Sequence, residues 1–191
     1  MTFEEIFAQV DGINGWMSKE DCSVLNKYAS RMERAKMVEI GSFLGRSTKV
    51  LLLSSPTSKV VSVDPYADNY QYAKDSPFIV INIPPDDAFN QINNNLREFG
   101  NWKLVRERAH NVGKEWKENI DFLFIDGDHS YEHVSQDIAD WVPGVKSGGY
   151  VLFHDYESPA FPGIAQAISE VKEKYFGEVV KEEQIGIGIK K

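Results

Sequence analysis

The sequence predicts an α/β fold in which a mostly parallel, doubly wound sheet carries helices on both faces. Apolar strand-like runs alternate with helix-like runs five times along the 191 residues, an order typical of parallel sheets with crossover helices. Residues 120–126 (IDFLFID) are nearly all apolar, as expected for a central strand that is covered on both faces. The first strand-like run ends in a glycine turn at Gly41, so the chain can pass directly from strand to helix.

Residues 1–36 are expected to form a helical N-terminal cap. Residues 3–10 repeat apolar side chains at helical spacing. A second helix is expected over residues 18–32, with Ser18 as its N-cap and an acidic residue three positions later. The loop between these helices contains two glycines. Trp16 in this loop is either a packing anchor for the second helix or part of a lid over a pocket; we favour the anchor, because buried aromatic residues mostly serve packing.

Five strands and their helices should make up most of the remaining chain. The strands are expected at residues 37–41, 59–64, 102–106, 120–126 and 150–154. The helices are expected at residues 47–53, 86–99, 112–118, about 132–141 and 164–175, with a turn at 143–149. Residues 178–181 and 184–189 should form an antiparallel pair at the sheet edge. Residues 65–86 form a tyrosine-rich connection, which we interpret as a substrate-side insert or as an edge decoration.

Composition limits the classes of function. The net charge is −8 and there is no long basic run, so nucleic acid is not an expected partner. No apolar run approaches the roughly 20 residues that span a bilayer, and the N-terminus lacks a signal-peptide pattern. We therefore expect a cytoplasmic protein without a membrane partner. The single cysteine excludes an intrachain disulfide. Without linkers or repeats, residues 1–191 should form one domain, and a homodimer stays open.

Residues 38–48 (VEIGSFLGRST) are the stretch most indicative of function. A strand that turns into a helix presents free N–H groups and a positive dipole end to a small polar ligand. The spacing of Gly41 and Gly45 differs from the G-x-G-x-x-G of nicotinamide and flavin sites. Glu39 would repel phosphate and suits an ammonium or sulfonium group, both of which S-adenosylmethionine carries. Asp64 follows about 20 residues later, where an acidic residue can bind ribose hydroxyls, although a turn aspartate is the alternative.

The segments VEIGSFLGRST, VVSVDPY and FLFIDGDHSYEHVSQDI, followed by GGYVLFHDY, resemble class I S-adenosylmethionine-dependent methyltransferases. Within them, the chain is similar to the branch of macrocin O-methyltransferase and the cephalosporin-hydroxylase-like proteins. The resemblance runs from Gly15 to about Tyr156. It implies a Rossmann-like sheet of seven strands with a reversed C-terminal strand. The cofactor contacts that it implies are Glu39, Gly41, Ser42, Gly45, Ser47, Asp64, Ala109 and Asp126.

Two acidic residues, Asp126 and Asp155, end consecutive core strands. Neighbouring strands lie about 4.8 Å apart, and two carboxylates that close either share a proton or bind a cation. The resemblance implies a divalent metal here, usually Mg²⁺, which would lower the pKa of an acceptor hydroxyl and hold it in line with the methyl group. His154 stands where several relatives have a second acidic residue. Either its imidazole is a ligand and favours transition metals, or the metal site is weak or lost.

His129 follows Asp126 by three residues and has two interpretations. An imidazole can act as a general base on the acceptor, or it can simply bond to Asp126 or Asp128 at a helix start. The leading function is methylation of a hydroxyl on a small molecule, such as a sugar or a natural-product ring. The alternatives are metal-independent methylation of an amine or carboxylate, with His129 or Asp128 as base, and a cofactor-binding module without catalysis.

Overall fold

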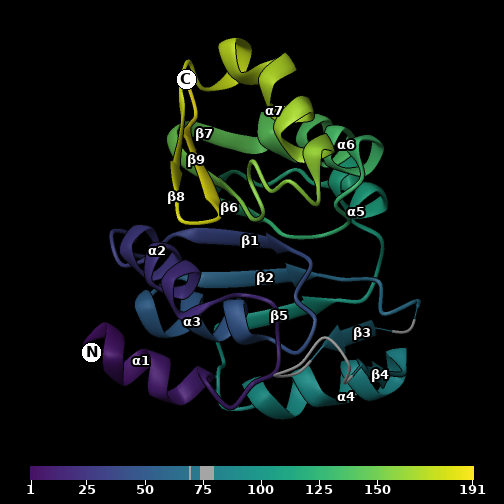
Figure 1. The fold of residues 1–191 in the computed structure, drawn as a ribbon. Coiled ribbons are helices and arrows are strands. Elements are labelled where there is room, and N and C mark those ends of the chain that lie inside the picture. Colours follow the sequence, from purple (N-terminus) through teal and green to yellow (C-terminus); the bar gives the residue numbers. More distant parts are fainter. Residues whose placement is uncertain (69, 74–79) are drawn as a thin grey trace.

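The computed structural model describes residues 1–68, 70–73 and 80–191. Its centre is a seven-stranded sheet with the order β5-β2-β1-β6-β7-β9-β8, which Figure 1 shows. The strands are β1 (Lys36–Ile40), β2 (Lys59–Val63), β5 (Trp102–Val105), β6 (Ile120–Ile125), β7 (Val145–Phe153), β8 (Val179–Glu182) and β9 (Ile185–Ile189). The first five are parallel, and β9 runs antiparallel to β7 and β8. The predicted fold class and the reversed C-terminal strand are therefore confirmed.

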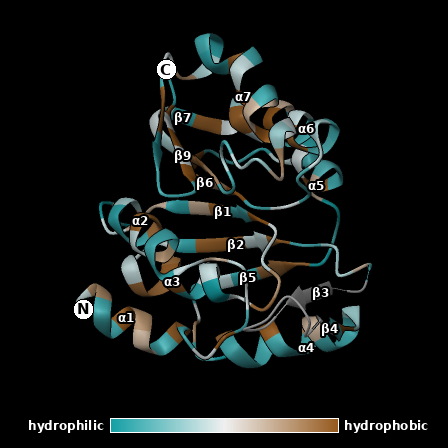
Figure 2. Ribbon diagram, in the orientation of Figure 1, coloured by the Kyte–Doolittle hydropathy of each residue, from teal (hydrophilic) through white to brown (hydrophobic). Residues whose placement is uncertain are grey.

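Seven α-helices in the described residues cover the two faces of this sheet. They are α1 (Phe3–Val10), α2 (Lys19–Ala29), α3 (Arg46–Ser54), α4 (Pro85–Leu96), α5 (Ala109–Glu115), α6 (Tyr131–Trp141) and α7 (Pro162–Tyr175). Side chains alternate along a strand. Met37 and Phe122 therefore pack with α1 to α4, whereas Val38 and Leu123 pack with α5 to α7. Figure 2 shows hydrophobic residues gathered in the sheet and hydrophilic residues on the outer turns of the helices. None of the helices described is long and apolar enough to cross a membrane.

The start of α2 follows the predicted signal. The Ser18 side chain accepts a hydrogen bond from the backbone of Asp21, and the Asp21 carboxylate accepts one from the backbone of Ser18. This reciprocal capping box satisfies two N–H groups that the helix itself leaves open. It also fixes the direction in which the preceding loop, residues 11–17, approaches the sheet.

Several element boundaries differ from the prediction; helices α2 and α4, for example, end at Ala29 and Leu96 and not at residues 32 and 99. Helix α5 begins at Ala109 and not at residue 112, because the Trp141 indole donates to the Ala109 carbonyl (3.2 Å) and packs on this first turn. Strand β7 begins at Val145, directly after the short 3₁₀ helix η1 (Val142–Gly144). Most of the turn predicted at 143–149 is therefore part of the strand. The register between β6 and β7 shifts near its start, as at a bulge. Such an irregularity leaves no alternation pattern in the sequence.

The connection between β2 and α4 contains a second, small sheet. Strands β3 (Tyr70–Ala73) and β4 (Val80–Ile83) pair antiparallel. The interpretation of residues 65–86 as a substrate-side insert falls partly on residues 69 and 74–79, which lie outside the described residues. At the base of this insert, buried Tyr66 donates from its hydroxyl to the Phe43 carbonyl (2.7 Å). The insert is thus tied to the glycine turn after β1.

Candidate active site

A cavity of about 790 Å³ opens at the carboxyl edge of the sheet. Most of the residues predicted from the sequence line it: Gly41, Ser42, Ser47, Asp64, Ala109, Asp126, His129, His154 and Asp155. Glu39 and Gly45 are the two predicted residues that do not. The topology explains this gathering, because the carboxyl ends of parallel strands meet at one edge of the sheet.

The glycine turn brings the ends of β1 and β6 into contact. Gly41 has φ +79°, and a Cβ atom at this position would lie 2.1 Å from the backbone oxygen of Asp126. Only glycine tolerates both the conformation and the approach. Asp64 holds the turn from the other side, since its carboxylate accepts hydrogen bonds from the backbone of Ser42 (2.9 Å) and Phe43 (3.0 Å). Asp64 thus acts as a turn aspartate while it also lines the cavity.

Gly45 and Glu39 support this turn from beneath. Gly45 has φ +88° and packs against the side chains of α4. Glu39 is fully buried, and its Oε2 accepts hydrogen bonds from the hydroxyls of Thr48 (2.5 Å) and Ser62 (2.8 Å). Its other oxygen, Oε1, has no hydrogen-bond partner. Burial outweighs the hydroxyl groups, including that of Ser47, and raises the pKa of Glu39 to about 7.

The loop before α2 forms a further wall of the cavity. The Arg46 guanidinium donates hydrogen bonds to the carbonyls of Met17 (2.9 Å) and Asp11 (3.1 Å) and so holds both ends of this loop. The Trp16 ring contacts the Phe43 ring in a tilted arrangement, with ring centroids 4.6 Å apart and an interplanar angle of 40°. Because Trp16 is 53% exposed and lines the cavity, the interpretation as a buried packing anchor is wrong. Its ring meets the glycine turn instead.

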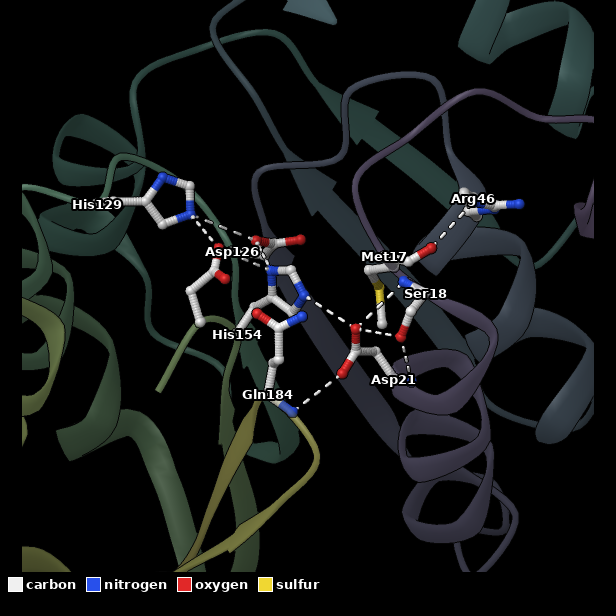
Figure 3. A network of polar contacts seen from close by, with 9 residues as sticks. Met17, Ser18, Asp21, Arg46, Asp126, His129, His154 and Gln184 are labelled. Carbon is white, nitrogen blue, oxygen red and sulfur yellow. Dashed lines mark hydrogen bonds and ion pairs between the residues drawn. The ribbon is translucent and has the colours of Figure 1, made fainter. Parts of the chain in front are cut away.

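Figure 3 shows a cluster of acidic and imidazole side chains at the ends of β6 and β7. These strands are neighbours, as predicted. Nδ1 of buried His154 lies 2.9 Å from Oδ1 of Asp126 and 3.4 Å from Oδ2 of Asp155. Nε2 of His129 lies 3.2 Å from Oδ2 of Asp155 and 3.9 Å from Oδ1 of Asp126. Asp155 adopts the left-handed conformation (φ +54°), which an aspartate tolerates.

The charges in this cluster depend on one another. Burial lowers the pKa of His129, but Asp126 and Asp155 outweigh it and raise that pKa to about 9. Burial likewise opposes protonation of His154, yet the surrounding carboxylates raise its pKa well above the ordinary value. Burial opposes ionisation of Asp126 and Asp155, but the two imidazoles outweigh it and lower the pKa of both carboxyl groups below the usual range. The cluster thus holds paired charges in a site that is largely shielded from water.

A third carboxylate reaches the cluster from the N-terminal helix. Asp21 is fully buried, and its Oδ2 lies 3.7 Å from Nε2 of His154. Its Oδ1 accepts a hydrogen bond from the backbone of Gln184 (3.1 Å), in the turn between β8 and β9. Burial opposes ionisation, but His154, Ser18 and Gln184 lower the pKa of Asp21 to about 2. Asp21 therefore joins α2, the end of β7 and the C-terminal hairpin.

Three further residues lie at the site, although the sequence had not indicated a role for them there. Asp21 was interpreted only as part of a helix start, and nothing local shows that it faces His154. Asp137 lines the cavity from the buried face of α6, where burial and neighbouring carboxylates raise its pKa to about 7. An acidic residue on an otherwise apolar helix face was the signal in the sequence that could have identified it. Phe161, before α7, stacks on His129 with ring centroids 4.3 Å apart. It is the lone aromatic side chain of residues 157–163.

Comparisons with known proteins agree with this arrangement. Residues 38–156 match a family described as a methyltransferase domain. An uncharacterized protein, R132, of Acanthamoeba polyphaga mimivirus is 26% identical over 152 residues, which are 78% of this chain and 65% of that protein. The chain thus spans less than two thirds of that relative's length.

Two solved structures share the fold at low identity. The O-methyltransferase NovP has a TM-score of 0.68 at 14% identity, covering 91% of this chain and 80% of NovP. The S-adenosylhomocysteine-bound methyltransferase PaMTH1 of Podospora anserina has a TM-score of 0.63 at 14% identity, covering 99% of this chain and 88% of that one. The matched family residues begin at the glycine-turn strand and end after the acidic cluster, so this chain belongs to the class I S-adenosylmethionine-dependent methyltransferase family.

Proposed function

We propose that this protein transfers the methyl group of S-adenosylmethionine to a hydroxyl of a small molecule, such as a sugar or a natural-product ring, with the help of a divalent cation. One observation carries the proposal. Asp126 touches both halves of the site: its backbone lies against Gly41 of the glycine turn, and its carboxylate contacts His154. A donor in the turn and an acceptor at the acidic cluster would therefore meet at this residue.

The donor side of the cavity is the glycine turn. When bound, S-adenosylmethionine supplies a methyl group on a positively charged sulfur. The backbone of Gly41 and Ser42 and the hydroxyl of Ser47 line the part of the cavity that would receive it. Glu39 would act from beneath, through the hydroxyl groups that it holds, and its unpartnered Oε1 fits a cationic neighbour. Asp64 and Ala109 would lie along the ribose and adenine.

The acceptor side is the acidic cluster. The residues that would hold a cation are Asp126, His154 and Asp155, whose oxygen and nitrogen atoms are all ligand types that divalent cations use. When bound, such a cation lowers the pKa of a coordinated hydroxyl. Nε2 of His129 lies 3.2 Å from Asp155. Because the neighbouring carboxylates raise its pKa to about 9, this atom would accept the hydroxyl proton without a cation only at alkaline pH, where the imidazole is neutral. Phe161 and Trp16 border the cavity and suit a ring-shaped acceptor.

A second candidate function is metal-independent methylation of an amine or a carboxylate, with His129 or Asp128 as base. The observation that favours it is that the imidazoles and carboxylates already form ion pairs with one another. A further alternative is a binding module without catalysis. The volume of the cavity, about 790 Å³, and its extension from the glycine turn to the acidic cluster speak against that alternative, because a module that only binds the cofactor needs no acceptor space.

The test measures cofactor binding and transfer separately. S-adenosylhomocysteine at about millimolar concentration should raise the melting temperature, by mass action on the folded state. Deuterated-methyl S-adenosylmethionine is then incubated with catechols, nucleotide sugars and primary amines, and products are identified by mass spectrometry with and without a chelator. Transfer to a hydroxyl that the chelator abolishes supports the proposal. No thermal shift contradicts the cofactor assignment, and chelator-resistant transfer to amines supports the second candidate.

A further inference from the structure

We infer that the cluster at the ends of β6 and β7 is built for a divalent transition-metal ion, such as Zn²⁺ or Co²⁺, in preference to Mg²⁺, with imidazole nitrogens of both His129 and His154 and the Asp126 carboxylate as its ligands. Potential ligand atoms of these three residues all lie within 4.8 Å of one another. The inference rests on the proposed function in one respect, since it names the cation that assists transfer. It adds His129 to the ligands and changes the expected metal.

The distances between the donor atoms suit a single ion. Two ligands with bonds of about 2.1 Å to one metal lie roughly 3.0–3.4 Å apart in octahedral or tetrahedral geometry. Nδ1 of His154 and Oδ1 of Asp126 are separated by 2.9 Å, and Nε2 of His129 lies 3.9 Å from the same oxygen. The side chain of His129 is 32% exposed, so it has room for the small movement required. Oδ2 of Asp155 lies 3.2 Å from His129 and 3.4 Å from His154 and offers a further oxygen.

Nε2 of His129 forms no hydrogen bond within the protein. This atom is buried and lies 3.2 Å from Oδ2 of Asp155, but this ion-pair contact does not have the geometry of a hydrogen bond. A buried polar atom that makes no hydrogen bond is unfavourable, so its place in a ligand-shaped cluster needs a reason. A metal bond to Nε2 would supply the missing partner. Phe161 stacks on the His129 ring at an interplanar angle of 20°, so the ring can slide toward the carboxylates while it keeps its plane.

The surroundings of His154 also match those of a metal ligand. A histidine that binds a metal through one ring nitrogen usually presents the other to a carboxylate, which orients the ring. Nδ1 of His154 faces Asp126, and its Nε2 faces buried Asp21 at 3.7 Å, an ion-pair contact that is longer than a hydrogen bond. Asp21 is held in place by the helix cap and by the Gln184 backbone. We therefore assign Asp21 as the residue that positions His154.

Charge and ligand type decide which metal is preferred. Asp21, Asp126 and Asp155 place three negative charges around two imidazoles. A divalent cation neutralises most of this charge with the imidazoles uncharged. Mg²⁺ is bound mainly through oxygen atoms and water, whereas imidazole suits zinc, copper, iron and nickel. Two imidazoles among the ligands therefore shift the preference away from Mg²⁺.

The experiment titrates the tag-free full chain, stripped with a chelator and dialysed, with Co²⁺, Zn²⁺ and Mg²⁺ by calorimetry, while the visible absorption of Co²⁺ reports imidazole ligation. We expect Zn²⁺ and Co²⁺ to bind at least about 100-fold more tightly than Mg²⁺. His154→Asp should weaken Co²⁺ binding at least about tenfold and improve Mg²⁺ binding. Asp21→Asn should cost about 10–100-fold in Co²⁺ affinity. His133→Ala, a variant of an exposed histidine on α6, is the control and should leave the Co²⁺ spectrum unchanged.

If His154→Asp does not fold, His129→Gln carries the test, because the His129 side chain is partly exposed. Circular dichroism without metal identifies the folded variants. Equal affinity for Mg²⁺ and Co²⁺ would overturn the inference, as would a Co²⁺ spectrum that survives the His129 change. Thermal shift with S-adenosylhomocysteine, measured on the same samples, separates the two ideas. A retained shift with no preference for Co²⁺ overturns the metal inference alone, whereas a lost shift contradicts the proposed function.

Discussion

Replacing Glu39 with glutamine should stabilise the protein at alkaline pH and leave its stability nearly unchanged in mild acid. Burial, helped by the negative charge of Asp126, raises the pKa of Glu39 from 4.5 to about 7. A carboxyl group with a raised pKa binds more protons in the folded state than in the unfolded state between these values. The free energy of unfolding therefore falls as pH rises from about 4.5 to about 7. Glutamine keeps the shape of the side chain and does not ionise.

The size of the effect follows from the shift. A difference of roughly 2.5 pKa units, at about 1.4 kcal/mol per unit, corresponds to roughly 3 kcal/mol. At about pH 8 the Glu39→Gln variant should exceed the wild type in stability by up to that amount, and its melting temperature by about 6–12 °C for a domain of this size. Thermal and urea unfolding, followed by circular dichroism at about pH 5 and about pH 8, measures both quantities.

A surface variant separates this effect from a change in net charge. Glu98→Gln also removes one negative charge, but its side chain is 61% exposed, so its effect should depend little on pH. The reasoning is wrong if the stability gained by Glu39→Gln is the same at both pH values, or if the variant is less stable than the wild type at alkaline pH.

Three further predictions concern the site. Asp126→Asn and Asp155→Asn should each lower methyl transfer at least about 100-fold, while the thermal shift with S-adenosylhomocysteine survives at least in Asp155→Asn; full activity of either variant would remove the cluster from the mechanism. Phe161→Ala should raise the acceptor KM about tenfold with a smaller change in kcat, and Phe161→Tyr should restore the KM. Arg46→Ala should shrink the cofactor-induced thermal shift, because the guanidinium holds two carbonyl groups of the cavity loop; an unchanged shift would show that the loop does not contribute to binding.

The order of elements could be predicted from the sequence because its signals are local. The alternation of apolar runs, the helix cap at Ser18 and the glycine turn at Gly41 each act within a few residues. Parallel strands then bring their carboxyl ends to one edge by geometry alone, which is why Asp126 and Asp155 could be placed together. The start of β7 was predicted five residues late, since the bulged region before Tyr150 has no regular alternation.

Contacts between distant segments could not be predicted in the same way. Asp21 precedes His154 by more than half of the chain, and its acidic side chain has a sufficient local explanation as part of a helix cap. Trp16 was interpreted as a packing anchor for the second helix, because buried aromatic residues mostly serve packing, whereas its ring lies against Phe43 beside the cavity. In each case a local signal was correct about the residue type, and the tertiary fold decided what the side chain faces.

The strand order also explains why the donor and acceptor sides of the cavity adjoin. The sheet order reverses between β1 and β6: the chain leaves β1 for α3 on one face and leaves β6 for α6 on the other. Loops that diverge from neighbouring strands leave a crevice between them, where ligands bind in open α/β sheets. Here Gly41 closes the base of that crevice against the Asp126 backbone. Any side chain at position 41 would push the two strand ends apart, and with them the glycine turn from the acidic cluster.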